Sequence, residues 1–103
     1  MAIKVIIERS VSPDNQNEVA ELLKELRTRA IRQPGYISGE TLFSVDRPGT
    51  HVVIGTWETL RDWKAWESNP KRLEIVKKID KLLTSSSKAV VYATAPRAMA
   101  EAV

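Results

Sequence analysis

The stretch of sequence that decides the fold is TWETLRDWKAWESNP, residues 56–70. A β-branched strand pattern ends here, a helical pattern begins, and all 3 tryptophans of the chain fall within it. Trp63 and Trp66 are separated by one helical turn, so they share one face of the helix. The pair Asn69-Pro70 is typical of a new helix start. The stretch therefore predicts a strand that leads into a two-piece helix, with the indoles gathered where strand and helix meet.

Hydrophobic patterns on either side of this stretch predict the other elements. Strands are expected over residues 3–10, 36–46, 50–58 and 88–94. Ser12-Pro13-Asp14 is typical of a helix N-terminus with serine as the cap, and Pro34-Gly35 ends that helix. The turn Asp46-Arg47-Pro48-Gly49 joins the second and third strands into a hairpin. Pairing Asp46 with Thr50 would place Gly39 opposite Trp57.

Each long helix should bury one apolar face. In the first helix the apolar residues recur at three-and-four spacing, at Val19, Leu22, Leu23 and Leu26, with Ala30 and Ile31 near its end. The short helix is expected from Thr59 to Ser68. The helix after Pro70 should bury Leu73, Val76, Ile79 and Leu83, with Ile75 and Leu82 beside them.

The order strand, helix, strand, strand, two-piece helix, strand is the split βαβ pattern of ferredoxin-like folds. We therefore predict an α+β fold with the order βαββααβ and a four-stranded antiparallel sheet that helices cover on one face. The other face would keep roughly half of the apolar strand residues, such as Ile6, Val52 and Ile54. An apolar face of this kind is rarely left in water, so we expect a homodimer that packs two sheets together.

Length and composition are those of an ordinary globular domain. The chain has 103 residues, and we expect one domain over residues 1–95 and a C-terminal tail over 96–103. No membrane span and no secretory signal pattern is evident, so we expect a cytoplasmic protein. The net charge of +3 is spread over helices of mixed charge, which argues against nucleic acid as a partner. With no cysteine and a single histidine, no metal site and no cofactor is expected.

The tryptophans have two interpretations. A small domain with 1 phenylalanine needs them for its core, and we expect Trp63 to be structural. Trp57 and Trp66 either pack in the core or line a cavity between helix and sheet. An indole suits the second role because it offers a flat apolar wall and one N–H donor.

Two titratable residues near strand ends are candidate proton acceptors. His51 follows the hairpin turn, where it is either an exposed histidine without a catalytic task or an acceptor at a pocket mouth. Glu8 either forms an exposed ion pair at the strand end or, if buried, is a general base with a raised pKa. Tyr36 and Tyr92 are expected to pack against the sheet.

These features resemble the antibiotic biosynthesis monooxygenase family, small proteins with a dimeric α+β barrel. The matching residues are Pro34-Gly35, Asp46-Arg47-Pro48-Gly49, Thr56-Trp57-Glu58 and Trp63-Lys64-Ala65-Trp66 before Ser68-Asn69-Pro70. The resemblance covers nearly the whole chain up to about Ala95. It implies the chemistry of the cofactor-free members, which oxidise phenolic or quinol-like aromatics with O2.

The resemblance also implies a site. Trp57 and Trp66 would line it, His51 or Glu8 would accept a proton, and Arg9 or Tyr92 would orient a small aromatic ligand. The alternative is a non-catalytic homodimer that binds a small apolar ligand. Haem binding is a distant third, because the haem-degrading members have a histidine where this chain has Val76 and Lys77, and an asparagine roughly where it has Glu8.

Overall fold

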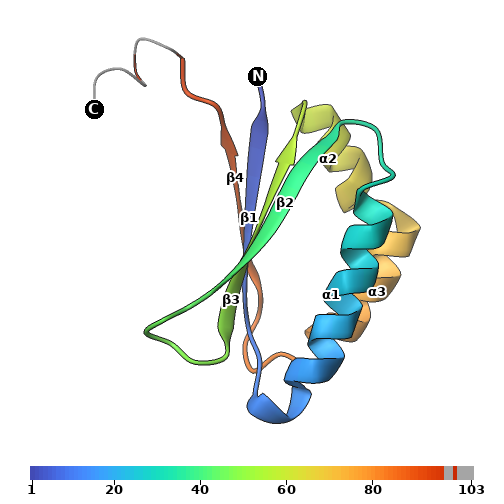
Figure 1. Ribbon diagram of the computed structural model, residues 1–103. Helices are drawn as coiled ribbons and strands as arrows, with labels where there is room; N and C mark the ends of the chain where they lie inside the picture. Colours follow the sequence, from blue (N-terminus) through green and yellow to red (C-terminus); the bar gives the residue numbers. More distant parts are fainter. Residues whose placement is uncertain (97–98, 100–103) are drawn as a thin grey trace.

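The computed structural model describes residues 1–96 and 99, and shows a layer of helices packed on one face of a four-stranded sheet (Figure 1). The strands are β1 (Ile3–Ser10), β2 (Tyr36–Phe43), β3 (Thr50–Trp57) and β4 (Lys88–Ala93). A 3-10 turn, η1 (Pro13–Asn15), precedes the helices α1 (Gln16–Ala30), α2 (Leu60–Glu67) and α3 (Pro70–Asp80). The strand order is β2-β3-β1-β4, antiparallel throughout. The predicted ferredoxin-like α+β fold is confirmed.

The register of the sheet decides which side chains lie beneath the helices. Ile3 pairs with Trp57, and Arg9 pairs with His51, across β1 and β3. Because side chains alternate along a strand, the odd-numbered residues of these two strands lie on the helix-covered face. The even-numbered residues lie on the open face, which carries the apolar side chains predicted there, namely Ile6, Val52 and Ile54.

The hairpin differs from the predicted register by two residues. Gly39 pairs with Gly55, and Trp57 pairs with Tyr36, so the predicted Gly39–Trp57 pair is wrong. The reason lies at the turn, where the backbone N–H of Ser44 donates to the carbonyl of Thr50 at 2.9 Å. This bond closes the hairpin at residue 44 rather than 46, so β2 ends three residues earlier than predicted.

Both long helices bury narrower faces than the apolar patterns suggest. α1 fully buries Val19 and Ala30. α3 buries Ile75 and Ile79, whereas Leu73, predicted inside, is 51% exposed. Leu73 precedes Ile75 by two residues, which is about 200° around a helix, so these two side chains point in opposite directions.

The ends of α1 are also set differently from the sequence prediction. The side chain of Ser12 makes no capping hydrogen bond, because the chain first forms η1, and α1 begins at Gln16. After α1, Gly35 adopts a φ of +81°, and its carbonyl accepts a hydrogen bond from the backbone N–H of Glu58 at 2.8 Å. This contact ties the start of β2 to the end of β3 and brings Tyr36 next to Trp57.

Among residues 1–96 and 99, no helix has the length and apolar character needed to cross a membrane. Most of the predicted tail, 96–103, lies outside the described residues, which include only Pro96 and Met99 of it.

Candidate functional site

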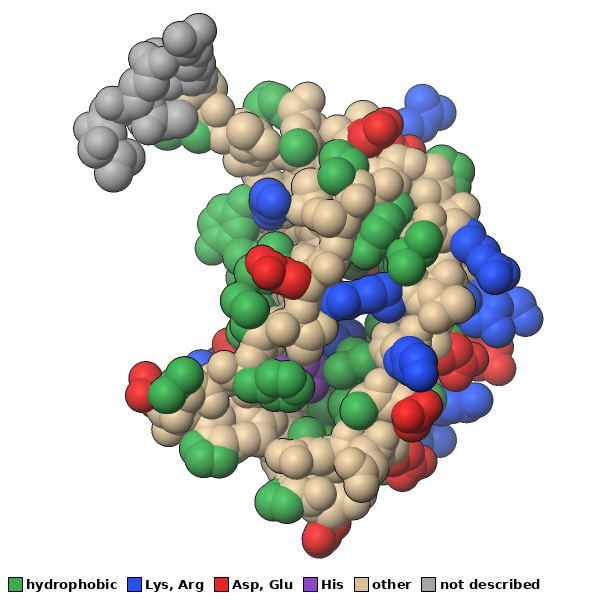
Figure 2. Space-filling view, in the orientation of Figure 1, with side chains coloured by type: hydrophobic (Ala, Val, Ile, Leu, Met, Phe, Trp, Pro, Cys, Tyr) green, Lys and Arg blue, Asp and Glu red, His purple; other side chains and the backbone are tan. Residues whose placement is uncertain are grey.

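A cavity of about 430 Å³ lies between the sheet and the helices α1 and α2. The core beside it is divided into two clusters, one around the tryptophans and one around Val19, Ile75 and Ile79, and Leu26 packs against both. The cavity adjoins the tryptophan cluster. The space-filling view shows a hollow between β2 and α1, surrounded by hydrophobic and basic side chains (Figure 2). This cavity is the candidate site.

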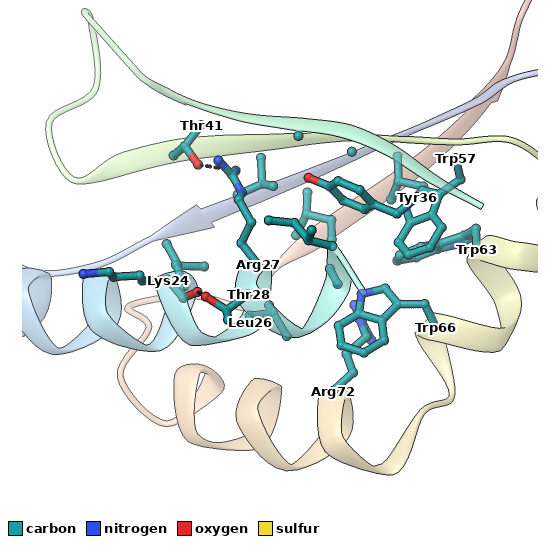
Figure 3. A pocket seen from close by; sticks show the side chains of 18 of the residues that line it. Lys24, Leu26, Arg27, Thr28, Tyr36, Thr41, Trp57, Trp63, Trp66 and Arg72 are labelled. Carbon is teal, nitrogen blue, oxygen red and sulfur yellow. Dashed lines mark hydrogen bonds between the residues drawn. The ribbon is translucent and has the colours of Figure 1, made fainter. Parts of the chain in front are cut away.

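Three indoles and a phenol form the aromatic wall of the cavity (Figure 3). Trp57, Trp63 and Trp66 are 2%, 3% and 4% exposed. The ring centroids of Trp57 and Trp63 are 6.1 Å apart, and Tyr36 meets Trp57 edge-on at 5.4 Å. Trp57 and Trp66 thus line a cavity, as one interpretation predicted. Trp63 also lines it, and all three indoles belong to the buried core cluster, as the structural interpretation predicted for Trp63.

The N-cap of α2 determines the position of two of these indoles. The hydroxyl of Thr59 accepts a hydrogen bond from the backbone N–H of Asp62 at 3.1 Å and donates one to the Asp62 carboxylate at 2.8 Å. This N-cap fixes the first residue of the helix. Trp63 and Trp66 then both face the sheet, and both are buried.

Two glycines leave part of the cavity floor without side chains. Gly39 and Gly55 pair across β2 and β3, and both line the cavity. A Cβ at Gly55 would meet only Nε1 of Trp57, at 3.5 Å, so the space above it is open. A Cβ at Gly39 would meet the Tyr36 hydroxyl at 2.7 Å and Nε of Arg27 at 3.5 Å. Gly39 therefore lets these two polar groups approach the sheet.

Among the described residues, the charged side chains that line the cavity are all basic: Arg9, Lys24, Arg27 and Arg72. Arg27 extends from α1 to the sheet, where Nη2 donates to the hydroxyl of Thr41 at 2.9 Å (Figure 3). Arg72 donates from Nη1 to the carbonyl of Glu67 at 3.1 Å, and its guanidinium lies 5.2 Å from the ring centroid of Trp63. The latter contact is a cation–π interaction.

Arg9 is the most deeply buried of these bases, at 2% exposure. Burial, and then the charge on Arg72, lower the pKa of Arg9 to about 10, while Asp80 acts in the opposite direction. Burial likewise lowers the pKa of Arg72, against the charges of Glu67 and Asp80. The cavity therefore combines apolar walls with a positive electrostatic potential.

The structure separates the predicted site residues between the two faces of the sheet. Arg9, Trp57 and Trp66 line the cavity. Glu8 and Tyr92 lie on the open face, because Glu8 alternates with Arg9 along β1 and Tyr92 pairs with Lys4. The prediction that these two residues share a site with the indoles is therefore wrong.

Glu8 instead forms an ion pair at the strand end, as one alternative predicted. Its Oε1 lies 2.8 Å from Nη2 of Arg47 in the hairpin loop. The side chains of Glu8 and Arg47 are 28% and 66% exposed, so the pair is in contact with water. Tyr92, 54% exposed on β4, lies on the same open face.

His51 is buried, so the expectation of an exposed histidine is wrong. It is 3% exposed, and its Nε2 has no hydrogen-bond partner among the described residues. Burial, and then the charge on Arg9, lower the pKa of His51, which keeps the ring neutral at pH 7. His51 does not line the cavity, whereas Arg9, its partner across the strands, does.

Sequence reasoning missed three cavity bases, Lys24, Arg27 and Arg72; the two arginines are the ones that reach across the cavity or against its indoles. In the sequence, Arg27 and Arg72 each lie among acidic and basic residues, a pattern that indicates a helix face in contact with water. A signal was present for Arg27, which is three residues before the buried Ala30 and so lies at the border of the apolar face. The equivalent signal for Arg72 is its place three residues before the buried Ile75.

The arrangement suits a flat aromatic molecule that carries or develops negative charge. Indoles stack on such a ring and exclude water, and guanidinium groups stabilise an anion in a site of low dielectric. Among the described residues, no carboxylate and no imidazole lines the cavity. A proton lost by the bound molecule would therefore pass to water or to a group behind the lining.

Among curated proteins, SchA of Streptomyces halstedii is 23% identical over 78 residues, a match that covers 76% of this chain and 20% of SchA. This chain therefore spans about a fifth of the length of that relative.

Solved structures share the fold. SnoaB, a cofactor-independent oxygenase from Streptomyces nogalater, superposes with a TM-score of 0.82 at 16% identity, covering 92% of this chain and 94% of SnoaB. A conserved protein from Methanosarcina mazei superposes with a TM-score of 0.84 at 18% identity, covering 89% of this chain and 91% of that protein. The antibiotic biosynthesis monooxygenase family model matches residues 2–78, which run from β1 to α3 and include the aromatic wall. The chain belongs to the antibiotic biosynthesis monooxygenase family.

Proposed function

We propose that this protein is a cofactor-independent monooxygenase that oxidises a small aromatic or quinol-type compound with O2. The observation that carries the proposal is the cavity beside the tryptophans, a space of about 430 Å³ lined by three indoles and the phenol of Tyr36. Membership of the antibiotic biosynthesis monooxygenase family supports the choice of reaction. SnoaB, which shares the fold, is a cofactor-independent oxygenase.

In this reaction the substrate itself supplies the electrons that reduce O2. A hydroquinone that loses a proton transfers electrons to O2; one oxygen atom then enters the ring and the other leaves as water. Hydroquinone plus O2 thus balances as hydroxybenzoquinone plus water, with no external reductant. The protein needs to bind the ring, stabilise its anion and keep bulk water away.

The residues at the cavity fit these tasks. Trp57 and Trp66 would hold the aromatic ring between them, and Arg9 would orient and stabilise the anion. His51 is the proton acceptor in this proposal, because it pairs with Arg9 across the strands and its lowered pKa keeps it neutral at pH 7. Glu8 has no part in the proposal, since it faces the other side of the sheet.

We also propose that the protein works as a homodimer that covers the open face of the sheet. Ile6 and Ile54 pair directly on that face. Around them the apolar side chains of Leu42, Val90 and Tyr92 are 49%, 45% and 54% exposed. Two copies packed face to face by a twofold axis would bury these side chains.

The activity can be tested by oxygen uptake with a panel of hydroquinones. The informative variant is Gly55→Val, because the added side chain enters the open space of the cavity and its Cβ meets only Nε1 of Trp57. The matched control is Ala65→Val on the exposed side of α2. We expect uptake by the natural protein and the control, and a large loss in Gly55→Val with unchanged folding.

The products distinguish the proposed reaction from the alternatives. With isotope-labelled O2, a monooxygenase places one labelled atom in the hydroxyquinone and one in water. Calorimetric binding of the quinols without oxygen uptake would instead support the non-catalytic, ligand-binding function. Oxygen uptake that Gly55→Val leaves unchanged would contradict a reaction in this cavity.

A further inference from the structure

The charges around the cavity are unbalanced. The lining contains four bases, Arg9, Lys24, Arg27 and Arg72, and no acidic side chain among the described residues. Buried charges in proteins are normally paired, because an isolated charge in an apolar environment loses its hydration without compensation.

Two of the arginines are accounted for by contacts within the chain. Arg27 donates to Thr41 at 2.9 Å, which links α1 to β2. Arg72 donates to the carbonyl of Glu67 and stacks on Trp63. These contacts hold both guanidinium groups in place at the aromatic wall, although neither group is paired with a carboxylate in the described part of the chain.

Arg9 is not accounted for. It is 2% exposed, and its Nε is buried without a hydrogen-bond partner among residues 1–96 and 99. None of the ion pairs of these residues involves it. Asp80 is near enough to raise its pKa, but burial and the repulsion from Arg72 outweigh that effect. Arg9 is thus a buried cation that lines the cavity beside a second cation. No anionic side chain of the described residues forms an ion pair with it.

We propose that the cavity binds aromatic carboxylates, with the ring against the tryptophans and the carboxylate between Arg9 and Arg72. A guanidinium matches a carboxylate with two parallel hydrogen bonds, which makes this pairing stronger than a neutral one. The floor of the cavity at Gly55 leaves open space for the ring. The inference rests on the proposed function in one respect, namely that the same molecule would be the quinol that is oxidised.

Binding is tested by isothermal titration calorimetry with two probes of equal size, 2-naphthoate and the neutral 2-naphthamide. We expect the natural protein to bind 2-naphthoate about tenfold more tightly, or more, because the amide cannot form a charge-assisted pair. Arg9→Met keeps an unbranched, flexible side chain, shorter than that of arginine, and removes its charge, so it should abolish the difference. Arg29→Met on the exposed side of α1 is the control, since Arg29 pairs only weakly with Glu25 at 3.8 Å, and it should preserve the difference.

A second measurement separates a binding role of Arg9 from a structural one. Without ligand, Arg9→Met should unfold at the same urea concentration as the natural protein or at a higher one, because it removes an uncompensated buried charge. A loss of stability would show that Arg9 holds the fold, which would overturn the inference. Equal affinity for the two probes, or no binding of 2-naphthoate at millimolar concentration, would also overturn it.

Oxygen uptake separates this inference from the proposed function. The substrates are 2,5-dihydroxybenzoate and its amide, which share the quinol ring and differ in charge. Preference for the carboxylate, lost in Arg9→Met, supports both. Equal oxidation of the two supports the monooxygenase and overturns the carboxylate site. Arg9-dependent binding without any oxygen uptake supports the carboxylate site and contradicts the monooxygenase.

Discussion

Arg9 pairs with His51 across β1 and β3, so a permanent cation and the only histidine of the chain lie next to each other beneath the helices. Both side chains are buried. Burial disfavours the protonated form of the histidine and lowers its pKa, and the positive charge of Arg9 lowers the pKa further. This pair therefore links the pH of the solution to the stability of the fold.

The first prediction is that the protein loses stability as the pH falls below about 6.5. His51 has a lowered pKa in the folded state, so the unfolded chain takes up the proton first. The free energy of unfolding should be highest above the unfolded pKa and should fall by at most about 1.4 kcal/mol per pH unit below it. Urea unfolding at about pH 7, 6 and 5 measures this slope.

The variant His51→Leu identifies the source of the slope. It keeps an apolar side chain at the buried position and removes the titrating ring, so its stability should change less between about pH 7 and pH 5. Equal slopes in the two proteins would show that the carboxylates, and not His51, set the pH dependence.

The second prediction concerns the contact between Gly39 and Tyr36. A Cβ at position 39 would come within 2.7 Å of the Tyr36 hydroxyl, so Gly39→Ala should destabilise the fold by about 1–3 kcal/mol. Adding Tyr36→Phe removes the hydroxyl and should restore part of the loss. A double-mutant cycle in urea measures the coupling. If the two effects simply add, the hydroxyl is not the obstacle.

The third prediction concerns Gly35, which has a φ of +81° and whose added Cβ would collide with the carboxylate of Asp62. Gly35→Ala should cost about 1–3 kcal/mol, from backbone strain and from disturbance of the cap of α2. Gln33→Ala in the same connection should change the stability by less than about 0.5 kcal/mol. The midpoints of urea unfolding of the two variants, compared with the natural protein, test this difference.

The fourth prediction tests the dimer. Ile54→Lys places a charge at the middle of the open face, beside its partner Ile6, and should yield a folded monomer. Leu73→Lys, at an exposed apolar position on α3, should leave the dimer intact. Light scattering at micromolar concentration reports the mass. A natural protein of monomer mass would contradict the proposed dimer directly.

The order of elements could be predicted from sequence because it depends on local patterns. Thr59 and Asn69-Pro70 mark helix starts by their own chemistry, and both junctions lie where the sequence places them, whereas α1 ends at Ala30, four residues before Pro34. The hairpin register could not be predicted in the same way, since the bond between Ser44 and Thr50 competes with alternatives of similar local quality.

The candidate site could be predicted only in part. Trp57 and Trp66 stand out because indoles are rare and gather in one stretch. Arg27 and Arg72 do not stand out, because an arginine on a helix is most often solvated, and only the packed structure shows which ones turn inward. The burial of His51 likewise depends on Arg9 and on the helix layer above it, which are far apart in the sequence.

The paired glycines of β2 and β3 have a consequence for redesign of this scaffold. Substitution of Gly55 by alanine, valine or leucine would fill progressively more of the open space above this residue. The volume of the cavity would then decrease stepwise. A series of such variants would differ in the size of the largest aromatic ligand that each can bind. The same backbone could then be tailored to progressively smaller rings without rebuilding its helices.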